Sequence, residues 1–286
     1  MKQKLTTSNL KWFSLMNAIN CSGLKNMILL FSSKKRNPMT KLNTSKWTKY
    51  KLLRKSSKLS VHLPKTAWLR KSSFWRMIKK YREIIIKPTG SYGGNGVIRI
   101  KKMDSSTYEI QDGAKKKNFT EHTQLNAYIK KKAGKNNIIQ QRIPLATVND
   151  RPFDLRVMVQ RRLNSPWEVT GKLAKVAGKG FIVTNIRMSS GKVVSVEHAL
   201  KNSALKTMRA ADLLSQLDKV ALQAAQKLAP FYPWVRTMGI DMAFDKEGNV
   251  WIIEVNFAPM LELFLKLKDK SMFHKMKSFH KNKPNK

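Results

Sequence analysis

Short apolar runs alternate with polar segments along the chain, and their spacing separates expected helices from expected strands. Helical spacing is clearest over residues 203–229. Shorter helices are expected over residues 44–56, 72–81 and 120–135. Extended stretches and strands are expected over residues 63–69, 83–88, 96–102, 106–113, 115–120, 137–143, 151–162, 167–178, 238–244 and 249–257. The pattern therefore predicts a chain that combines helices with hairpins of strands.

The composition fits a folded chain without disulfides. Of the 286 residues, 42% are hydrophobic, which is enough for a sizeable core in one large domain or two smaller ones. The single cysteine, Cys21, excludes a disulfide framework and a cysteine-built zinc site, and it fits a reducing compartment. The apolar stretch at residues 27–31 is too short for a membrane span or a signal peptide. We therefore expect a soluble, cytoplasmic protein without a transmembrane segment.

The charge of the chain is strongly positive. Lysine and arginine total 57 against 17 acidic residues, giving a net charge of +40, and no acidic residue precedes Glu83. Such a charge attracts polyanions, whether nucleic acid, anionic polymer or anionic membrane surface. No zinc finger, RNA-binding aromatic motif or heptad-plus-basic region accompanies it. We therefore expect nonspecific attraction to nucleic acid, and a dedicated nucleic-acid protein remains a third hypothesis.

A glycine-rich segment, KPTGSYGGNG at residues 87–96, separates two of the expected strands. Glycine allows a positive φ angle and close approach of the backbone to a ligand. One interpretation is a flexible hairpin loop. The other is a flap over phosphate groups with Lys87 as the charge beneath it. The glycines concerned are Gly90, Gly93, Gly94 and Gly96.

The last expected hairpin contains a second group of polar residues. Glu254 follows three apolar residues, and Asn256 lies on the same face of the strand. If Glu247 and Gly248 form a two-residue turn, Asp241 lies directly across from Glu254, and Asp245 beside the turn is expected to be solvated. Two carboxylates and an amide oxygen suit a hard cation such as Mg²⁺ or Mn²⁺. The alternative is an edge acid that faces solvent, with Asn256 beginning a turn.

The glycine loop matches neither common phosphate-binding motif. No G-K-[ST] follows it, and the next element is a strand and not the helix of a dinucleotide-binding fold. A lysine, a glycine flap between strands and a distant acidic hairpin resemble the ATP-grasp fold. From Lys46 to Pro259 the motif order resembles ATP-grasp proteins of the endospore coat-associated YheC/YheD type. The matching segments are SKWTKYKLL, LPKT, IIIKPTGSYGGNG, IIQQRI, RPFDLRVMVQ, WEVTGKLAKVAG, IVTNI and GIDMAFDKEGNVWIIEVNFAP.

The resemblance implies an α+β ATP-grasp fold with the nucleotide between two α+β lobes. The implied regions are a basic N-terminal tail or lead-in, an N-terminal lobe with the flap, a C-terminal lobe with the metal hairpin, and a basic C-terminal tail. Their expected bounds are residues 1–40, 41–136, 137–262 and 263–286. Only residues 1–45 precede Lys46, which is too few for the full substrate domain of many ATP-grasp ligases. If translation starts at Met39 and not at Met1, this segment is shorter still.

The resemblance also assigns roles to individual residues. Two lysines would contact the nucleotide phosphates beneath the flap, and residues 138–143 would form the strand against which adenine lies. The implied nucleotide-binding residues are Lys46, Lys87, Gly90, Gly93, Gly94, Gly96, Gln140, Gln141 and Asn185, with one of the two glutamines near the base or ribose. The implied catalytic residues are Asp154, Arg156 and Lys175, with Arg156 bidentate to the γ-phosphate or the acceptor carboxylate. The implied metal ligands are Asp241, Glu254 and Asn256, for one or two Mg²⁺ ions, with Mn²⁺ as the alternative.

Such a site implies an ATP- and Mg²⁺-dependent ligase that joins a carboxylate to an amine or thiol through an acylphosphate. The charge suggests an anionic peptide or polymer as the acceptor, bound by the basic surface or by a partner chain. The rival interpretation is a spore-coat-associated protein that keeps the ATP-grasp shell, binds nucleotide or polyanion, and catalyses nothing. Under the resemblance, the expected location is the cytoplasm, with spore association as a further expectation.

Overall fold

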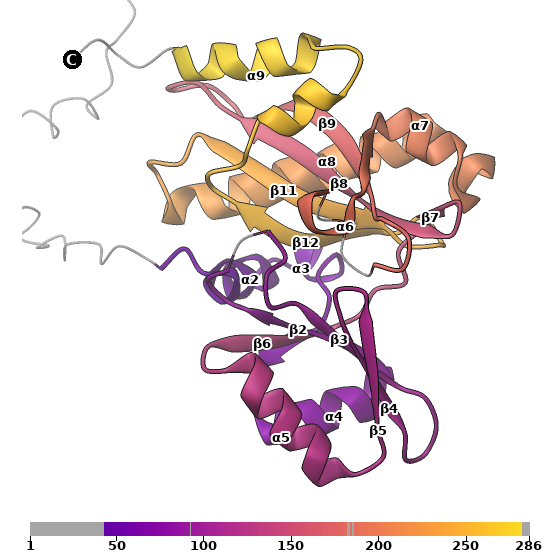
Figure 1. The fold of residues 1–286 in the computed structure, drawn as a ribbon. Helices are drawn as coiled ribbons and strands as arrows, with labels where there is room; N and C mark the ends of the chain where they lie inside the picture. Colours follow the sequence, from indigo (N-terminus) through magenta and orange to yellow (C-terminus); the bar gives the residue numbers. More distant parts are fainter. Residues whose placement is uncertain (1–42, 92, 182–183, 185, 282–286) are drawn as a thin grey trace, which may run out of the picture. The chain divides into compact units, whose positions relative to one another are not determined.

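The computed structural model describes residues 43–91, 93–181, 184 and 186–281 (Figure 1). The expected tail over residues 1–40, the alternative start at Met39 and the predicted site residue Asn185 lie outside the described residues. From Asn43 onward the chain forms one unit. The described strands of this unit build two antiparallel sheets.

Two helices cover one face of the first sheet. Helices α4 (Lys71–Tyr81) and α5 (His122–Ala133) pack against it through a core that includes Ile84 and Ile86 (Figure 1). Because side chains alternate across a strand, Ile85 and Lys87 face away from these helices. The strands, in spatial order, are β1 (Thr66–Trp68), β6 (Asn137–Gln141), β2 (Glu83–Pro88), β3 (Ile98–Lys102), β4 (Tyr108–Asp112) and β5 (Lys115–Phe119).

The second sheet lies between helices on both of its faces. Its largest core, which includes Phe153, Leu155 and Val157, packs against α8 (Ala210–Leu228). On the other face, Met158 and Leu173 pack against η3 (Glu262–Lys266) and α9 (Ser271–Lys281). The strands, in spatial order, are β10 (Lys192–Val194), β9 (Glu168–Val176), β8 (Arg151–Gln160), β11 (Thr237–Phe244) and β12 (Val250–Asn256), with β7 (Thr147–Val148) paired to β8.

Shorter helices complete the described part of the chain. Of these, α2 begins after Ser45, whose hydroxyl accepts a hydrogen bond from the Thr48 N–H at 3.3 Å and so caps the helix. The remaining elements are α2 (Lys46–Arg54), α3 (Ser57–Ser60), α6 (Ile186–Ser189), α7 (Val196–Lys201), η1 (Ala204–Thr207) and η2 (Ala229–Phe231). Within the described residues, no helix has the length and apolar composition needed to cross a membrane.

The two sheets divide the chain differently from the expected lobes. β6 pairs with β1 and β2, so residues 137–141, which we expected in the C-terminal lobe, belong to the first sheet. Helices α2 and α3 precede the first sheet in sequence, yet Tyr50, Leu53 and Leu59 join the core of the second sheet. The helix that carries Lys46 is therefore anchored to the second sheet.

Most of the expected elements are present, with ends shifted by a few residues. The long helix differs most, because α8 begins at Ala210 and not near residue 203. The Ser203 hydroxyl accepts a hydrogen bond from the Leu205 N–H at 3.1 Å and caps the separate turn η1. Met208 then takes an extended conformation, which interrupts the helix that the apolar spacing predicted.

Candidate functional site

The hairpin of β11 and β12 contains an irregularity that decides which side chains share a face. Met242 pairs with Ile252, but the next pair along the hairpin joins Asp241 to Glu254. Ile253 is therefore an extra residue in β12, a β-bulge. The predicted pairing of Asp241 with Glu254 is confirmed.

This pairing arises from a different turn than the predicted one. The connection runs from Asp245 to Asn249, whose carbonyl accepts the Asp245 N–H at 3.1 Å. Asp245 is buried and accepts hydrogen bonds from the N–H groups of Glu247 and Asn249 and from the Trp251 indole. The expectation of a solvated Asp245 was wrong, because its carboxylate satisfies the turn's own donors. Turn and bulge each shift the register by one residue, and the two shifts cancel at the predicted acid pair.

Polar side chains from four strands gather on the face of the second sheet opposite α8. In the backbone register Arg156 pairs with Asp241, and Asp154 pairs with Lys175. The Asp241 carboxylate accepts from Arg156 Nε at 2.9 Å and from Arg156 Nη2 at 3.1 Å. It also accepts from Lys175 Nζ at 2.9 Å and from Asn256 Nδ2 at 3.1 Å. The three predicted catalytic residues therefore lie in one cluster with two predicted metal ligands.

These contacts use the full acceptor capacity of Asp241. Each carboxylate oxygen offers about two lone-pair positions. Oδ1 accepts from Arg156 and Lys175, and Oδ2 accepts from Arg156 and Asn256. Lys175 also forms an ion pair with Asp154 Oδ1 at 2.9 Å. The cluster is therefore a closed network of two cations and two carboxylates.

Burial and charge act in opposite directions on this network. Burial raises the pKa of Asp241, but the charges and hydrogen bonds of Arg156 and Lys175 outweigh burial and hold that pKa below its ordinary value. For Asp154, burial dominates and raises the pKa, although Lys175 opposes it. Burial lowers the pKa of Lys175, but the two carboxylates overcome this effect and raise it. Asp241 is therefore the carboxylate that the network holds most firmly in its charged form.

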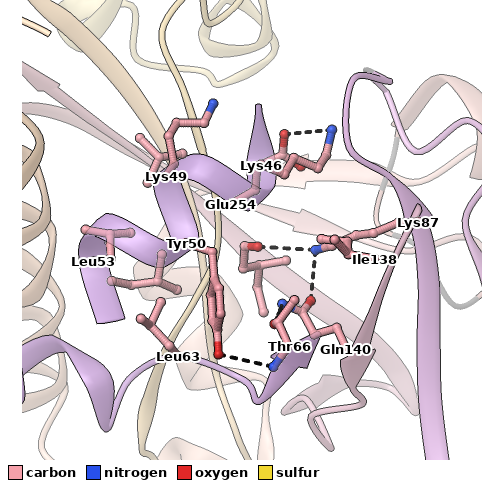
Figure 2. A pocket seen from close by; sticks show the side chains of 13 residues that line it. Lys46, Lys49, Tyr50, Leu53, Leu63, Thr66, Lys87, Ile138, Gln140 and Glu254 are labelled. Atoms are coloured by element: carbon pink, nitrogen blue, oxygen red, sulfur yellow. Dashed lines mark hydrogen bonds and ion pairs between the residues drawn. The ribbon is translucent and has the colours of Figure 1, made fainter. Parts of the chain in front are cut away.

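Lys87 extends from the first sheet to the second. Its Nζ donates to Gln140 Oε1 at 2.8 Å and to the Ile253 carbonyl at 3.4 Å (Figure 2). A bulge residue lies outside the regular ladder, which leaves its carbonyl available to this lysine. Gln140 donates in turn to the Thr66 hydroxyl at 2.8 Å. Burial lowers the pKa of Lys87, while Glu254 opposes the shift.

Glu254 lies beside the N-terminus of α2. Its Oε1 is 3.2 Å from Lys46 Nζ (Figure 2). The same lysine contacts the glycine loop, because Nζ donates to the Ser91 carbonyl and its backbone N–H donates to the Thr89 carbonyl at 3.2 Å. Lys46 therefore links the flap to the acidic hairpin.

The cavity around Lys87 and Lys46 is small, about 30 Å³, and is lined in part by Tyr50 and Leu53 (Figure 2). This volume holds water-sized groups and not a nucleotide base. The two lysines therefore line a cavity of water size, and the base of a bound nucleotide would lie outside it.

The glycine loop uses glycine for a conformational reason at three of its four positions. Gly93, Gly94 and Gly96 have φ angles of 71°, 79° and 72°, in the left-handed region. A Cβ on Gly96 would also lie 3.0 Å from the Pro88 ring. Gly90 has open space around it and no such φ angle. The loop therefore has a defined turn at its distal end.

The two glutamines of β6 point in different directions. Gln140 faces Lys87, whereas the side chain of Gln141, on the other face of the strand, accepts from the Lys65 N–H at 3.4 Å. Of the two alternatives, the structure therefore brings Gln140 into the candidate site. Thr184, next to Asn185 in sequence, donates its hydroxyl to Asp154.

Sequence reasoning missed two residues of the site. Lys49 is buried at 7% exposure in the Lys87 cavity, and burial lowers its pKa to about 8, opposed by Glu254. Its spacing of three from Lys46 on an expected helix was the available signal. Gly239 allows close packing, because a Cβ there would lie 2.4 Å from Pro259. A glycine inside an expected strand was its signal.

The predicted metal ligands provide oxygen donors that suit a hard cation, but these donors are engaged. Within the described residues, no three His, Cys, Asp or Glu side chains gather as a metal-binding group. Asn256 presents its amide nitrogen, not its oxygen, to Asp241. The set therefore fits Mg²⁺ only if Asn256 turns its amide and a cation releases one oxygen of Asp241.

Lys87 precedes the glycine-rich loop on the first sheet and contacts the hairpin of the second sheet that carries the paired acids Asp241 and Glu254, and this arrangement fits an ATP-grasp protein. The chain matches the family described as YheC/D like ATP-grasp over residues 37–280, and it belongs to that family. The predicted family and the α+β ATP-grasp fold are thereby confirmed.

Two curated relatives come from Bacillus subtilis (strain 168). The chain is 23% identical to endospore coat-associated protein YheC over 221 residues, which cover 75% of this chain and 59% of YheC. It is 23% identical to endospore coat-associated protein YheD over 227 residues, which cover 77% of this chain and 49% of YheD. The chain therefore spans about half the length of these relatives.

Two solved complexes are among the structures to which the chain is similar. One is the ATP-grasp ligase PsnB with a phosphomimetic variant of its minimal precursor, Mg and ADP, at a TM-score of 0.48 and 16% identity over 82% of this chain and 57% of PsnB. The other is the ADP complex of purK, N5-carboxyaminoimidazole ribonucleotide synthetase, at a TM-score of 0.45 and 14% identity. This match covers 76% of this chain and 45% of purK.

Proposed function

We propose that this chain is an ATP- and Mg²⁺-dependent ligase that joins a carboxylate to an amine or a thiol through an acylphosphate. Membership of the ATP-grasp family supports an ATP-dependent ligase in general terms. The observation that carries the proposal is the contact of Lys87, from the first sheet, with the Ile253 carbonyl of β12, next to Glu254 and its ion-pair partner Lys46 on α2. Asp241, at the centre of its ion-pair network, lies on β11 directly across from Glu254 and on the same face of the second sheet.

The lysines and the flap would bind the triphosphate. The side chain of Lys87 is buried and that of Lys46 is largely buried. Solvent therefore screens the attraction between their charges and a bound phosphate only weakly. The backbone N–H groups of the glycine loop would close over the phosphates. Gln140, already bonded to Lys87, would lie near the base or the ribose.

The proposed reaction has two steps. An acceptor carboxylate oxygen attacks the γ-phosphorus, the bond to the β,γ-bridging oxygen breaks, and ADP leaves with its electron pair. The amine or thiol then attacks the acyl carbon, inorganic phosphate leaves, and the nucleophile loses a proton. Arg156 and Lys175 would neutralise charge that develops on the transferred phosphoryl group. A divalent cation held by Asp241, Glu254 and Asn256 would neutralise further phosphate oxygens.

The acceptor in this proposal is an anionic peptide or polymer. The net charge of +40 supports an anionic partner. A partner chain is a second source of acceptor-binding surface. The names of the two Bacillus subtilis relatives support a spore-associated role.

Thermal unfolding of the full chain with and without ATP and Mg²⁺ tests nucleotide binding. A ligand at a hundred times its Kd stabilises by about 2.7 kcal/mol, which corresponds to a Tm increase of about 5–11 °C for a domain of this size. Glu254→Gln should remove most of the increase and leave the apo fold intact. Glu247→Gln, an exposed change in the same hairpin, is the matched control and should retain it. No Tm increase for the parent protein would contradict the proposal.

Release of ADP upon addition of acceptors tests catalysis. A set of acidic peptides and polymers, each with and without an amine donor, would be incubated with the protein and Mg²⁺ATP. We expect ADP release only with a matching acceptor, and loss of release in Arg156→Gln. Binding that falls steeply with salt and ignores ATP would instead indicate a nucleic-acid protein.

The second candidate function is that of a binding protein that keeps the ATP-grasp fold but catalyses nothing, and the Asp241 network favours it. All acceptor positions of this carboxylate are used by protein donors, so the cluster is complete as an ion-pair network. This candidate predicts an ATP-dependent Tm increase without ADP release for any acceptor. The ligase hypothesis predicts both the Tm increase and the release of ADP.

A further inference from the structure

A second cavity, of about 270 Å³, is lined by basic side chains from both sheets. Arg99 comes from β3, Lys116 from β5, and Arg142 from the segment after β6. Arg151, the first residue of β8, adds a fourth cation. Among the described residues that line the cavity, Asp150 is the only acidic one. We call this feature the Arg99–Arg142 cavity.

Arg142 is a buried cation with incomplete compensation. Its side chain is 16% exposed, and its Nε, like that of Arg99, is buried without a hydrogen-bond partner, whereas its Nη1 donates to the Ile143 carbonyl. Glu83 Oε1 lies 4.0 Å from this nitrogen, beyond hydrogen-bond distance. Burial lowers the pKa of Arg142, Glu83 opposes the shift, and Arg99 adds to it. A buried cation with a free donor is costly unless an anion contacts it.

The neighbouring acids do not neutralise the group. Arg99 contacts Glu83 at 3.4 Å and also Glu109, and Glu109 lies 3.3 Å from Lys116. Three cations, Arg99, Arg142 and Lys116, therefore share two carboxylates, Glu83 and Glu109. At least one positive charge remains, beside a cavity large enough for a small ligand.

The cavity adjoins the candidate active site without sharing its residues. Pro152 lines the cavity, and Asp154, two residues along β8, belongs to the Asp241 network. Residues two apart on a strand share a face and lie about 7 Å apart. A group in the cavity would therefore lie near the proposed reaction centre but outside the lysines that would bind the triphosphate.

We propose that the Arg99–Arg142 cavity binds an oxyanion group, a carboxylate or a phosphate, that does not belong to the ATP triphosphate. Arg142 Nε donates to this group, and Arg99 and Lys116 neutralise it. The site is formed by the first sheet, the start of β8 and the segment after β9, so it goes beyond the ligase proposal and does not depend on catalysis. Two sources carry this chemistry: an acidic side chain of a peptide, or free inorganic phosphate.

Isothermal titration of the full chain with inorganic phosphate and, separately, with a triglutamate peptide tests the site. We expect binding of at least one probe, and tighter binding of the peptide would identify the acidic side chain as the source. Arg142→Gln should weaken binding roughly tenfold or more, because a hydrogen bond to a charged group is worth about 1.5–3 kcal/mol. Lys116→Gln, at a 55% exposed side chain that folding does not require, should weaken it to a smaller extent.

Glu109→Gln provides a test of opposite sign. It releases Arg99 and Lys116 from a competing carboxylate, so anion binding should become tighter. Lys132→Gln is the matched control, because it removes one charge from the same sheet's helix α5 at a residue that does not line the cavity. Its binding should equal that of the parent protein. Equal weakening in Arg142→Gln and Lys132→Gln, or no binding of either probe to the parent protein, would overturn the proposal.

Discussion

Replacing Asp241 with asparagine should destabilise the protein even without nucleotide. The carboxylate holds Arg156 in a bidentate pair and Lys175 in a second pair, and the three side chains are 9–13% exposed. Asparagine keeps the size but loses the charge, so both cations remain buried with less compensation. Breaking a buried ion pair by removing one partner costs about 3–5 kcal/mol.

We expect the lower end of that range, because Asp154 still contacts Lys175. A loss of about 3 kcal/mol corresponds to a Tm decrease of about 6–12 °C for a domain of this size. Differential scanning calorimetry at pH 7 measures the Tm, and urea unfolding measures the free energy. A Tm decrease of only a degree or two would refute the reasoning, because it would mean that the network contributes little.

The double variant Asp241→Asn with Lys175→Met isolates the pairwise contact. Removing the uncompensated lysine should recover part of the lost stability, so the two effects should not add. Additivity within about 0.5 kcal/mol would contradict a direct interaction.

The dependence of stability on pH in the acid range gives a second check. The pKa of Asp241 lies below its ordinary value of 3.8, so its contribution is complete above that pH and is lost as the pH falls. The stabilities of the parent and Asp241→Asn should therefore converge in acid.

Three further predictions concern the lysines and the flap. Lys87→Met should abolish the ATP-dependent Tm increase without lowering apo stability, because burial already disfavours the charged form; calorimetry with and without nucleotide measures both. Gly96→Ala should weaken ATP binding in a titration, because φ there is +72° and a Cβ approaches Pro88, whereas Gly90→Ala should bind as the parent does. The pKa of Lys49 falls from 10.5 to about 8 on burial, so apo stability should rise between those pH values as the folded form releases its proton first. Lys49→Met should remove that rise, worth up to about 3 kcal/mol, in urea unfolding across the same pH range.

The sequence was most informative where a local rule decides the structure. The glycine loop could be located because positive φ angles favour glycine, and Gly93, Gly94 and Gly96 adopt them. The pairing of Asp241 with Glu254 was predicted correctly but for an incomplete reason, because the real turn and the bulge compensate each other. Apolar residues at 250, 252 and 255 carried the signal of that bulge, since their spacing changes from two to three.

The ion pairs of the site could not be derived from any local pattern. Lys175 and Asp241 are 66 residues apart, and they meet only because β8 lies between β9 and β11. Strand order depends on long-range packing, which apolar periodicity does not encode. Likewise, no local pattern indicated that α2 would pack under the second sheet, which places Lys46 against Glu254. Tertiary packing therefore supplies the contacts, while local sequence supplies the residues.

The bulge at Ile253 gives Lys87 a partner that ordinary substitution does not remove. The acceptor is a main-chain oxygen, so any amino acid at this position still presents it. Drift in the side chain at 253 would leave the bridge between the sheets in place, whereas deletion of that single residue would remove the extra carbonyl and with it the bridge, while Glu254 would stay paired with Asp241 on the same face. This link is thus tolerant of point mutation and vulnerable to a one-codon loss.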